Sequence, residues 1–376
     1  MLTRHGAATR PLLSIAIPTW NRRAILDDCL DGLAQALDRL AARWEIRRLV
    51  EVVVSDNASD DGTWERLGER VAAFPCPLRR YRHGTNLGAA RNLISLLDRA
   101  DGDYFLFIGD DDRLVEDGLD GLLAVLQRRR PNAVIQIDEP GARRIRWTDM
   151  AGACRWFDSY GNAYCGCIRL DLARQACARF ALHHHIPDLV WPQTAFGFLG
   201  MHLAGGGRTV ALVNWPIGTS PLWDRLNVAS TGYFARSMCD LLEIAWLVER
   251  ASGCGAGLDR LLAPRSRFLR HHLRGLARMA LLGPCDRPAL EHRLAHLRRR
   301  IGPRLLPLGW RVRAATCRPL SSLLWIAAAL TRGEPPWAAL RRLRSEQAEH
   351  GRRLAQRQQA GVRRGDQFSP AAADRT

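Results

Sequence analysis

The fold is decided by the stretch Tyr104-Phe105-Leu106-Phe107-Ile108-Gly109-Asp110-Asp111-Asp112, an apolar run that ends in three consecutive carboxylates. Like charges a few ångströms apart repel by about 1 to 4 kcal/mol per pair at effective dielectrics of about 80 to 20. A divalent cation offsets this repulsion, and Mg²⁺ and Mn²⁺ prefer carboxylate oxygens and substrate phosphates. The triplet therefore predicts a metal site, with a solvated turn capping a helix near Leu114 as the alternative.

Strand and helix signals alternate on the amino-terminal side of this stretch. Apolar or β-branched runs predict strands at 12–17, 49–54, 79–82 and 104–108. Apolar residues at helical spacing follow each run, at 24–42, 63–73, 89–99 and 115–129. Four strand–helix units predict an α/β fold with a mostly parallel central sheet flanked by helices. Ligands bind outside the carboxyl ends of such strands, which here are the polar segments 18–23, 55–63 and 109–113.

The remainder of the chain divides by pattern. Strands are predicted at 133–137, 163–170 and 209–213, between loops rich in Trp, His, Gly and Pro. Helical spacing dominates from residue 233, and residues after about 354 are polar. The predicted organisation is a flexible start, two halves of one α/β domain, a basic helical C-terminal region and a disordered tail, over 1–11, 12–130, 131–230, 231–353 and 354–376.

Charge, cysteine content and apolar runs indicate where in the cell the protein is expected. The 376 residues carry a net charge of +17, and residues 231–376 hold 27 Arg against 11 acidic residues. Ten irregularly spaced cysteines without a CxxC pair favour free thiols in a reducing cytosol. The apolar run at 12–17 is too short for a signal sequence, and 320–330 is too short to cross a bilayer.

Two further segments carry candidate ligand-binding chemistry. Ser55 to Thr63 places three carboxylates among small turn residues, where Asp56 can accept a hydrogen bond from a base or a ribose hydroxyl. His83 to Asn92 places glycines before a helix with Arg91 in its first turn, which suits a diphosphate. Taken alone, each also fits a polar capping loop or an ordinary glycine turn.

Four motifs in order carry a family resemblance. They are Pro18-Thr19-Trp20-Asn21-Arg22, then 56–63, then 86–92, then 102–112. Together they resemble the family 2 glycosyltransferases of the GT-A fold, strongly to about residue 130 and loosely to 226. The resemblance implies inverting transfer of a sugar from a nucleotide diphosphate donor to an acceptor hydroxyl. It also makes 12–130 the nucleotide-sugar-binding half and 131–230 the acceptor-binding half.

The resemblance also implies roles for individual residues. Donor-binding residues would be Pro18, Thr19, Asn21, Arg22, Asp56, Asn57, Asp60, Arg91 and Asp110. Asp110 and Asp112 would form the DxD pattern that holds the metal, Mg²⁺ or Mn²⁺, and Asp111 could take it in a shifted alignment, so which two of the three bind it stays open. Inverting transfer needs a general base on the acceptor side. Position favours Asp188 for that role, with Asp158 and His185 as rivals.

The basic C-terminal region predicts docking at an anionic membrane surface. The apolar segment 320–330 and the Arg-rich segment 337–344 suit helices lying at such an interface. A solvated helical surface is the alternative, and the absence of a recognised module argues against nucleic acid. The three histidines at 183–185 with Cys165 and Cys167 lack tetrahedral zinc spacing.

These patterns lead to one functional hypothesis and two alternatives. We expect a bacterial glycosyltransferase, peripheral on the inner face of the cytoplasmic membrane, acting on a glycan or lipid-linked acceptor in surface polysaccharide or lipopolysaccharide assembly. A metal-dependent nucleotidyltransferase is one alternative, although no suitable Gly-rich loop follows the first strand. A non-catalytic sugar-binding scaffold of the same fold is the other.

Overall fold

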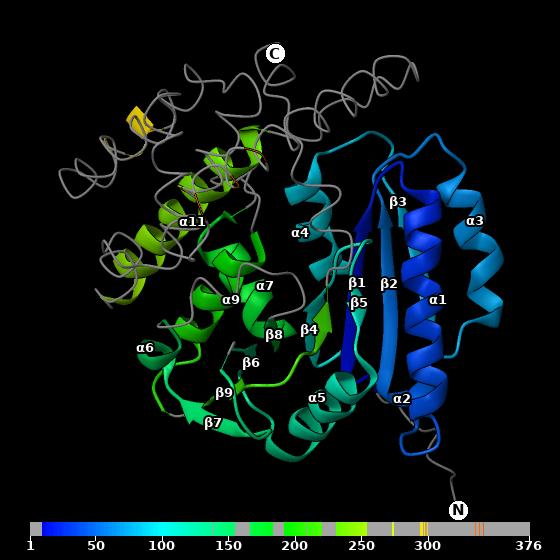
Figure 1. Cartoon of the computed structure of the whole chain (residues 1–376), viewed down its shortest axis with the longest axis horizontal. Helices are drawn as coiled ribbons and strands as arrows, with labels where there is room; N and C mark the ends of the chain where they lie inside the picture. Colours follow the sequence, from blue (N-terminus) through cyan, green and yellow to red (C-terminus); the bar gives the residue numbers. More distant parts are fainter. Residues whose placement is uncertain are drawn as a thin grey trace, which may run out of the picture. The chain divides into compact units, whose positions relative to one another are not determined.

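The structure is a computed structural model of the whole chain (Figure 1). It describes residues 10–137, 139–154, 166–182, 192–207, 209–219 and 231–253, together with isolated later positions. These residues fall into two compact units, which are treated separately. The first contains 10–219 and 247–253, and the second contains 231–246 and the later positions.

The first unit is built on an eight-stranded sheet with the order β3-β2-β1-β4-β8-β6-β9-β7. The strands, in chain order, are β1 (Leu13–Thr19), β2 (Val50–Asp56), β3 (Leu78–Arg82), β4 (Tyr104–Phe107), β6 (Ala133–Gln136), β7 (Ile145–Thr148), β8 (Gly166–Arg169) and β9 (Val210–Val213). A separate two-stranded sheet pairs β5 (Arg113–Leu114) with β10 (Gly218–Thr219).

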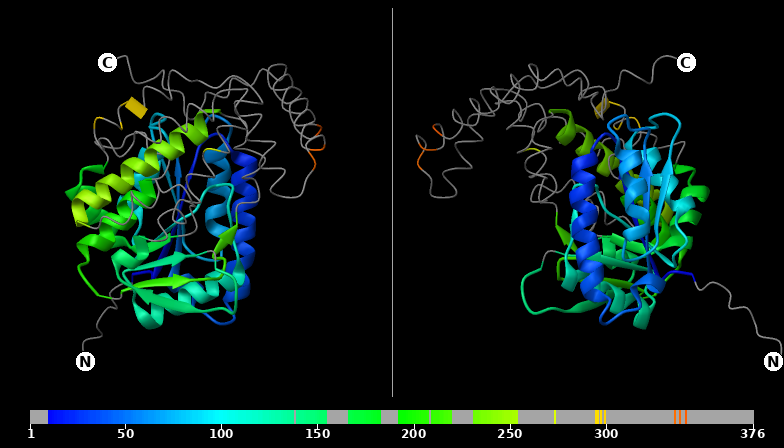
Figure 2. Two further views of the ribbon diagram at one scale, coloured as in Figure 1. Left: turned by 60° about the vertical axis from the view of Figure 1, so that its left-hand side comes forward. Right: turned by 90° about the vertical axis from the view of Figure 1, so that its right-hand side faces the viewer.

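The helices of this unit connect and cover the strands. They are α1 (Arg23–Leu40), α2 (Ile46–Leu49), α3 (Thr63–Arg70), the 3₁₀ turn η1 (Val71–Ala73), α4 (Ala89–Arg99), α5 (Glu116–Arg129), α6 (Met150–Ala153), α7 (Leu170–Arg179) and α9 (Pro192–Leu203). In Figure 2 the blue helix α1 lies alongside the central strands. A further helix, α11 (Thr231–Ser252), spans residues of both units.

Parallel pairing joins the first four strands. β1 pairs in parallel with β2 and β4, and β2 pairs in parallel with β3. Beyond β4 the sheet is mixed: β8 runs antiparallel to both β4 and β6, β9 runs parallel to β6, and β7 runs antiparallel to β9. The predicted α/β class, with a mostly parallel sheet flanked by helices, is confirmed. The strand expected over 163–170 is shorter, because Leu170 already begins α7, and the patterns did not predict β7, α7 or α9.

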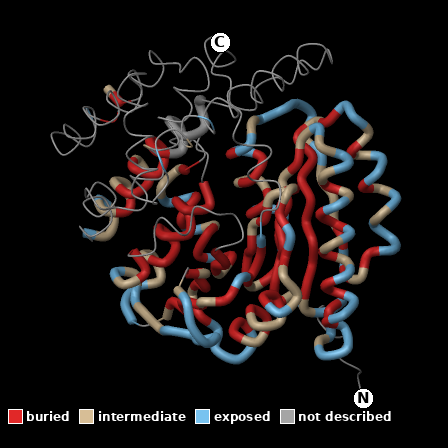
Figure 3. The backbone as a smooth tube through the Cα atoms, viewed as in Figure 1, coloured by how far each residue is buried: buried red, intermediate tan, exposed pale blue. Residues whose placement is uncertain are grey.

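Apolar burial explains why these segments form these elements. The central strands β1, β2 and β4 are mostly red in Figure 3, while α1 and α3 alternate between red, tan and pale blue. Leucines spaced along one face of α1 are buried against the sheet, namely Leu26, Leu30, Leu33, Leu37 and Leu40. Burying each such side chain contributes roughly 1.5 to 3 kcal/mol. The continuous valine run of β2 is buried on both faces, as expected for a central parallel strand.

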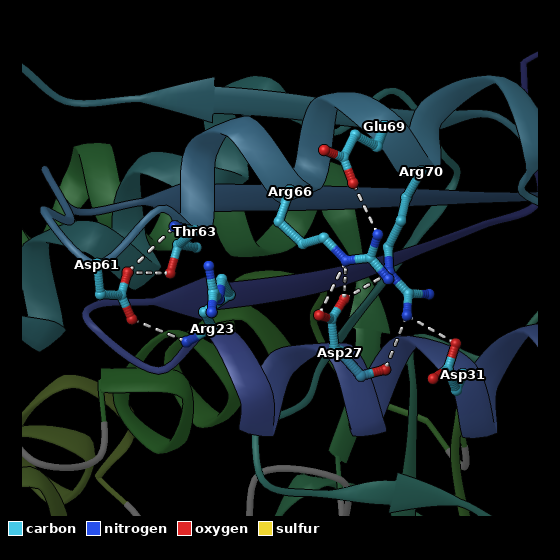
Figure 4. A network of polar contacts seen from close by, with 8 residues as sticks. All are labelled: Arg23, Asp27, Asp31, Asp61, Thr63, Arg66, Glu69 and Arg70. Atoms are coloured by element: carbon cyan, nitrogen blue, oxygen red, sulfur yellow. Dashed lines mark hydrogen bonds and ion pairs between the residues drawn. The ribbon is translucent and has the colours of Figure 1, made fainter.

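An ion-pair network ties α1 to α3 on the outside of the domain (Figure 4). Arg70 donates to Asp27 at 2.6 Å and to Asp31 at 2.7 Å. Arg66, one turn earlier on α3, donates to Asp27 at 3.0 Å and to Glu69 at 2.7 Å. Two arginines of one helix therefore share a single aspartate of the other.

Candidate active site at the carboxyl ends of the strands

Three strands deliver their carboxyl ends to one edge of the sheet. Thr19, the last residue of β1, pairs in register with Asp56, the last residue of β2. Just beyond β4, Ile108 donates its backbone N–H to Ala16 of β1 at 3.0 Å. The polar loops that follow β1, β2 and β4 therefore begin side by side, as the sequence predicted for a ligand site.

The aspartate loop after β4 is anchored to the end of β1. Asp110 accepts a 2.8 Å hydrogen bond from Thr19 Oγ1 on one oxygen and a 2.7 Å bond from Arg22 Nη1 on the other. The same Arg22 nitrogen lies 3.4 Å from Asp111 Oδ2. Asp112 folds back to accept from the backbone N–H of Gly109 at 2.7 Å. The loop thus places two of its three carboxylates, those of Asp110 and Asp111, against one arginine.

Burial and charge set the protonation behaviour of this loop. Burial raises the pKa of Asp110 above its ordinary value, and Arg22 opposes that rise. For Arg22, burial lowers the pKa, but the charges of Asp110 and Asp111 outweigh it and the net shift is upward. The neighbouring Cys29 thiol has its pKa raised by burial and by the same carboxylates. Arg22 is therefore a permanent cation, and Cys29 stays a neutral thiol.

The capping alternative for the aspartate triplet is wrong. Helix α5 begins at Glu116, and the residue before it, Val115, provides no side-chain cap among the described residues. Asp112 instead closes the turn of its own loop through Gly109. Asp110 and Asp112 are both buried, so the triplet is not a solvated turn either.

The loop after β2 holds Asp56 in a buried position. Asp56 Oδ1 accepts from the backbone N–H of Ser59 at 3.1 Å. Among the described residues, Asp56 Oδ2 has no hydrogen-bond partner, although Arg82 Nε lies 3.3 Å away as an ion pair. Asp56 is fully buried, and this oxygen has acceptor capacity left beside the charge of Arg82.

Other residues of this loop form hydrogen bonds with the loop after β1. Asn21 donates its backbone N–H to Ser59 Oγ at 2.9 Å, and its side-chain oxygen accepts from the Asp60 N–H at 2.9 Å. Asn21 and Ala58 both adopt positive φ angles, of 50° and 62°, an uncommon backbone conformation outside glycine. The two loops therefore form one interlocked unit.

Asp61 fills the structural role that the capping alternative gave to this segment. Asp61 accepts from the Thr63 N–H at 3.1 Å and from the Arg23 N–H at 2.9 Å, at the starts of α3 and α1. Burial raises the pKa of Asp61, but these hydrogen bonds outweigh it and leave the pKa below its ordinary value. One carboxylate of the segment caps helices, while Asp56 lies in the site.

The glycine segment before α4 completes the site. Gly88 precedes the helix with a φ of 82°, a conformation that favours glycine. In the first turn of α4, Arg91 is exposed and makes no hydrogen bond or ion pair with the described residues. The buried Asn92 donates to the carbonyls of Ser55 at 3.2 Å and Thr19 at 3.4 Å. The start of α4 is thereby fixed against the ends of β1 and β2.

The structure brings together most of the predicted donor residues that it describes. Thr19, Arg22, Asp110 and Asp111 form one contact group, and Asn21 and Asp60 form a second. Pro18 lies half-buried in β1 beside them. The three candidate general bases, Asp158, His185 and Asp188, lie outside the described residues, as do His183 and Cys165.

Several residues of this site were not singled out from the sequence. Asn86 and Asn92 flank the helix start and bond across to the loops after β1 and β2, and Arg82 ion-pairs with Asp56. Asparagines on both sides of a helix start are a local signal for such bonding. Across the described part of the chain, no group of three or more His, Cys, Asp or Glu could itself hold a metal ion.

Comparison with known proteins gives a family and several relatives. Residues 14–165 match the family model Glycosyl transferase family 2. The abequosyltransferase RfbV of Salmonella typhimurium is 34% identical over 116 residues, which is 31% of this chain and 32% of that protein. The putative teichuronic acid biosynthesis glycosyltransferase TuaG of Bacillus subtilis is 28% identical over 176 residues, covering 44% and 64%.

A third relative is the GalNAc(5)-diNAcBac-PP-undecaprenol β-1,3-glucosyltransferase of Campylobacter jejuni, 27% identical over 118 residues, covering 30% of this chain and 34% of that protein. The matches thus span between about a third and two thirds of these relatives' own lengths. Among solved structures, S. aureus TarS 1-349 in complex with UDP-GlcNAc aligns at 15% identity over 86% of this chain and 92% of that chain, with a TM-score of 0.48.

Proposed function

We propose that the family 2 glycosyltransferase domain formed by residues 14–165 transfers a sugar from a nucleoside diphosphate donor to an acceptor hydroxyl. The four motifs predicted this family, and residues 14–165 match its model. The observation that carries the proposal is the convergence of Asp56, the start of α4 and the aspartate loop at one edge of the sheet.

Each of the three parts suits a different portion of the donor. Asp56 has an acceptor oxygen left over, which suits an N–H of the base or a ribose hydroxyl. The start of α4 presents backbone N–H groups and the exposed Arg91, which suit the diphosphate. The aspartate loop brings carboxylates to the place where a cation would bridge to phosphate oxygens.

We propose Asp111 as the first ligand of a divalent metal in the aspartate loop, because Asp110 and Asp112 are both buried and both accept hydrogen bonds within the protein. Both oxygens of Asp110 already accept hydrogen bonds, from Thr19 and Arg22. The Asp111 side chain is the more exposed, at 15% against 7% for Asp110. Such ions are commonly held by one or two carboxylates with substrate phosphates at the other positions. When bound, Mg²⁺ or Mn²⁺ offsets negative charge on the nucleoside diphosphate leaving group.

The chemical step that we propose is an inverting displacement. A general base takes the proton of the acceptor hydroxyl as its oxygen attacks the anomeric carbon and the nucleoside diphosphate leaves. Asp188 is our candidate for the base, with Asp158 and His185 as rivals. Arg22 holds Asp110 and Asp111 in place beside the leaving group through the contacts described above.

The acceptor is proposed to be a glycan or lipid-linked intermediate of the bacterial cell envelope. The relatives' names, which include teichuronic acid biosynthesis and a polyprenyl-diphosphate-linked acceptor, support this class. None of the helices in the described part of the chain is long and apolar enough to cross a membrane. We propose peripheral binding of the basic region 231–353 to the inner face of the cytoplasmic membrane.

Two measurements test these proposals. UDP-linked and GDP-linked sugars are screened for protection against thermal unfolding and for hydrolysis, with Mg²⁺, Mn²⁺ or a chelator. We expect metal-dependent protection by one donor class, and the absence of any donor binding would overturn the enzyme proposal. Pyrophosphate release from a nucleoside triphosphate would indicate nucleotidyl transfer instead.

Flotation with anionic liposomes at low and high salt tests the membrane proposal, which fails if the protein floats in neither.

A further inference from the structure

The loops after β2 and before α4 are joined by a pair of asparagine side chains. Asn57 donates its side-chain N–H to the side-chain oxygen of Asn86 at 2.7 Å. The side-chain oxygen of Asn57 accepts from the backbone N–H of Leu87 at 2.8 Å. Asn86 accepts a second bond, from the backbone N–H of Gly88 at 2.8 Å. We call this arrangement the Asn57–Asn86 latch.

Backbone donors fix the orientation of both amides in the latch. The N–H groups of Leu87 and Gly88 can only donate, so the side-chain atoms that face them are oxygens. With its oxygen on Leu87, Asn57 turns its NH₂ group toward Asn86. Asn57 is only 2% exposed. Its amide therefore serves the neighbouring loop rather than facing solvent.

The latch sits where the rest of the loop has little support. Residues 84–87 are exposed, and a Cβ built at Gly84 or Gly88 would meet nothing within 4 Å. Gly88 is the residue from which α4 starts, and Asn92 donates its backbone N–H to the Gly88 carbonyl at 3.1 Å in the first helical turn. Because α4 starts from Gly88, the latch that holds Gly88 also fixes the position of the first turn of α4 and of Arg91.

The backbone of Asn57 is itself anchored to β1. Its backbone N–H donates to the carbonyl of Thr19 at 3.0 Å, which extends the β1–β2 pairing by one step. Asp56, its neighbour in the chain, is the buried carboxylate with a spare acceptor oxygen. Asn57 thus stands between the strand end proposed to meet the nucleoside and the helix start proposed to meet the diphosphate.

We infer that Asn57 is a positioning residue that acts through Asn86 and Leu87 to hold the first turn of α4, with Arg91, at the donor diphosphate. This inference rests on the proposed function. The latch contributes to binding of the phosphate portion of the donor and leaves recognition of the nucleoside to the Asp56 side of the site. Its loss is therefore felt by nucleoside diphosphates and not by nucleosides.

The direct test compares Asn57→Ala with wild type by calorimetric titration of UDP, GDP, uridine and guanosine in the full-length protein. Two lost hydrogen bonds of about 0.5 to 1.5 kcal/mol each correspond to roughly a 5- to 150-fold loss of nucleoside diphosphate affinity. Nucleoside affinity should stay within about twofold. An equal loss for nucleoside and diphosphate, or none for either, would overturn the inference. Asn132→Ala is the matched control, because Asn132 bonds Thr209 outside the site.

A double-mutant cycle tests whether the two asparagines act as a pair. Asn57→Ala and Asn86→Ala should each weaken diphosphate binding, and the double variant should be little worse than either alone. Additive losses would mean that Asn57 acts independently of Asn86 and would contradict the latch.

Hydrogen exchange separates failure of this inference from failure of the proposed function. In the ligand-free protein, Asn57→Ala should speed amide exchange at residues 86–91 while exchange in β1 and β2 stays unchanged. Unchanged exchange at 86–91 would overturn the latch even if donors bind. If exchange rises as expected but wild type binds neither UDP nor GDP, the latch stands as a loop anchor and the proposed donor role is wrong.

Discussion

Two buried carboxylates at opposite ends of the same strand behave differently. Glu51, near the start of β2, accepts hydrogen bonds on both oxygens, from Ser14 Oγ and the Asp101 N–H, each at 2.6 Å, and from Arg79 at 2.9 Å. Asp56, at the end of β2, is equally buried but, among the described residues, leaves one oxygen without a hydrogen bond. The same strand thus carries one fully satisfied carboxylate and one with spare acceptor capacity.

The difference separates a structural end of the sheet from the end that we propose binds the donor. The satisfied Glu51 joins β1, β2, β3 and the turn before β4, because Ser14 also accepts from the Gly102 N–H at 2.8 Å. An unsatisfied buried acceptor costs about 1 to 3 kcal/mol, which a protein tolerates where a ligand supplies the missing donor. Substitutions at the two ends should therefore affect different measurements.

The largest effect is expected at the structural end. Glu51→Ala leaves Arg79, Ser14 and the Asp101 N–H without their buried acceptor, so the free energy of unfolding should fall by about 3 to 5 kcal/mol. Urea denaturation followed by circular dichroism measures this. Glu45→Ala is the control, because Glu45 is exposed and pairs with the exposed Arg48, and its effect should be close to zero. Equal losses of unfolding free energy for Glu51→Ala and Glu45→Ala would contradict the structural role of Glu51.

The aspartate loop extends the comparison to the end of β4. Asp111→Asn removes a proposed metal ligand without emptying the core, so kcat for donor turnover should fall about 100-fold or more while the midpoint of thermal unfolding hardly changes. Asp28→Asn serves as the control, because Asp28 is an exposed carboxylate paired with Arg113 at 3.7 Å. A fully active Asp111→Asn enzyme would move the metal to Asp110 and Asp112 or exclude it.

A smaller effect is expected for Asp56→Asn. The asparagine oxygen can still accept from Ser59, but the carboxylate with spare capacity is lost, so donor affinity should fall about 10-fold through one weakened charge-assisted bond. Titration with the donor identified above measures it, with Asp38→Asn on the exposed face of α1 as the control. Loss of folding stability with unchanged affinity would place Asp56 with Glu51 as a structural group.

The smallest effects belong to the ion pairs outside the site. Arg70→Ala should lower the free energy of unfolding by about 1 kcal/mol, because Arg70 is 12% exposed and bonds both Asp27 and Asp31. Arg66→Ala should cost less, because Arg66 is 43% exposed and its pairs are screened by water. Chemical denaturation of both variants checks the order, and neither should alter donor binding.

The sequence predicted the first four strand–helix units closely because their patterns are strong. The valine run of β2 and the leucine spacing of α1 each have one dominant period, and the structure places both within two residues of the predicted bounds. The second half is harder to predict, because β7, with Arg146 between Ile145 and Trp147, is exposed at its start and gives little apolar signal. Strand direction past β4 also has no local signature.

Pairings across the chain were the part of the site that the sequence could not supply. Asn57 and Asn86 are 29 residues apart, and Thr19 and Asp110 are 91 apart. Local patterns indicated that each of these residues ends a strand or begins a turn. They did not indicate which side chains would hydrogen-bond to one another and which would keep an oxygen without a hydrogen bond. That distinction separates Asn57 from Asp56.

The order of the sheet has a consequence for how the protein behaves at high concentration. β3 and β7 are its two outermost strands, and one backbone edge of each has no partner strand among the described residues. β3 carries Arg79, Arg80 and Arg82, and β7 carries Arg146. Charged side chains on an outer strand repel a second copy and hinder edge-to-edge association. The arginines of β3 and β7 therefore disfavour pairing of these edge strands with a strand of a second copy.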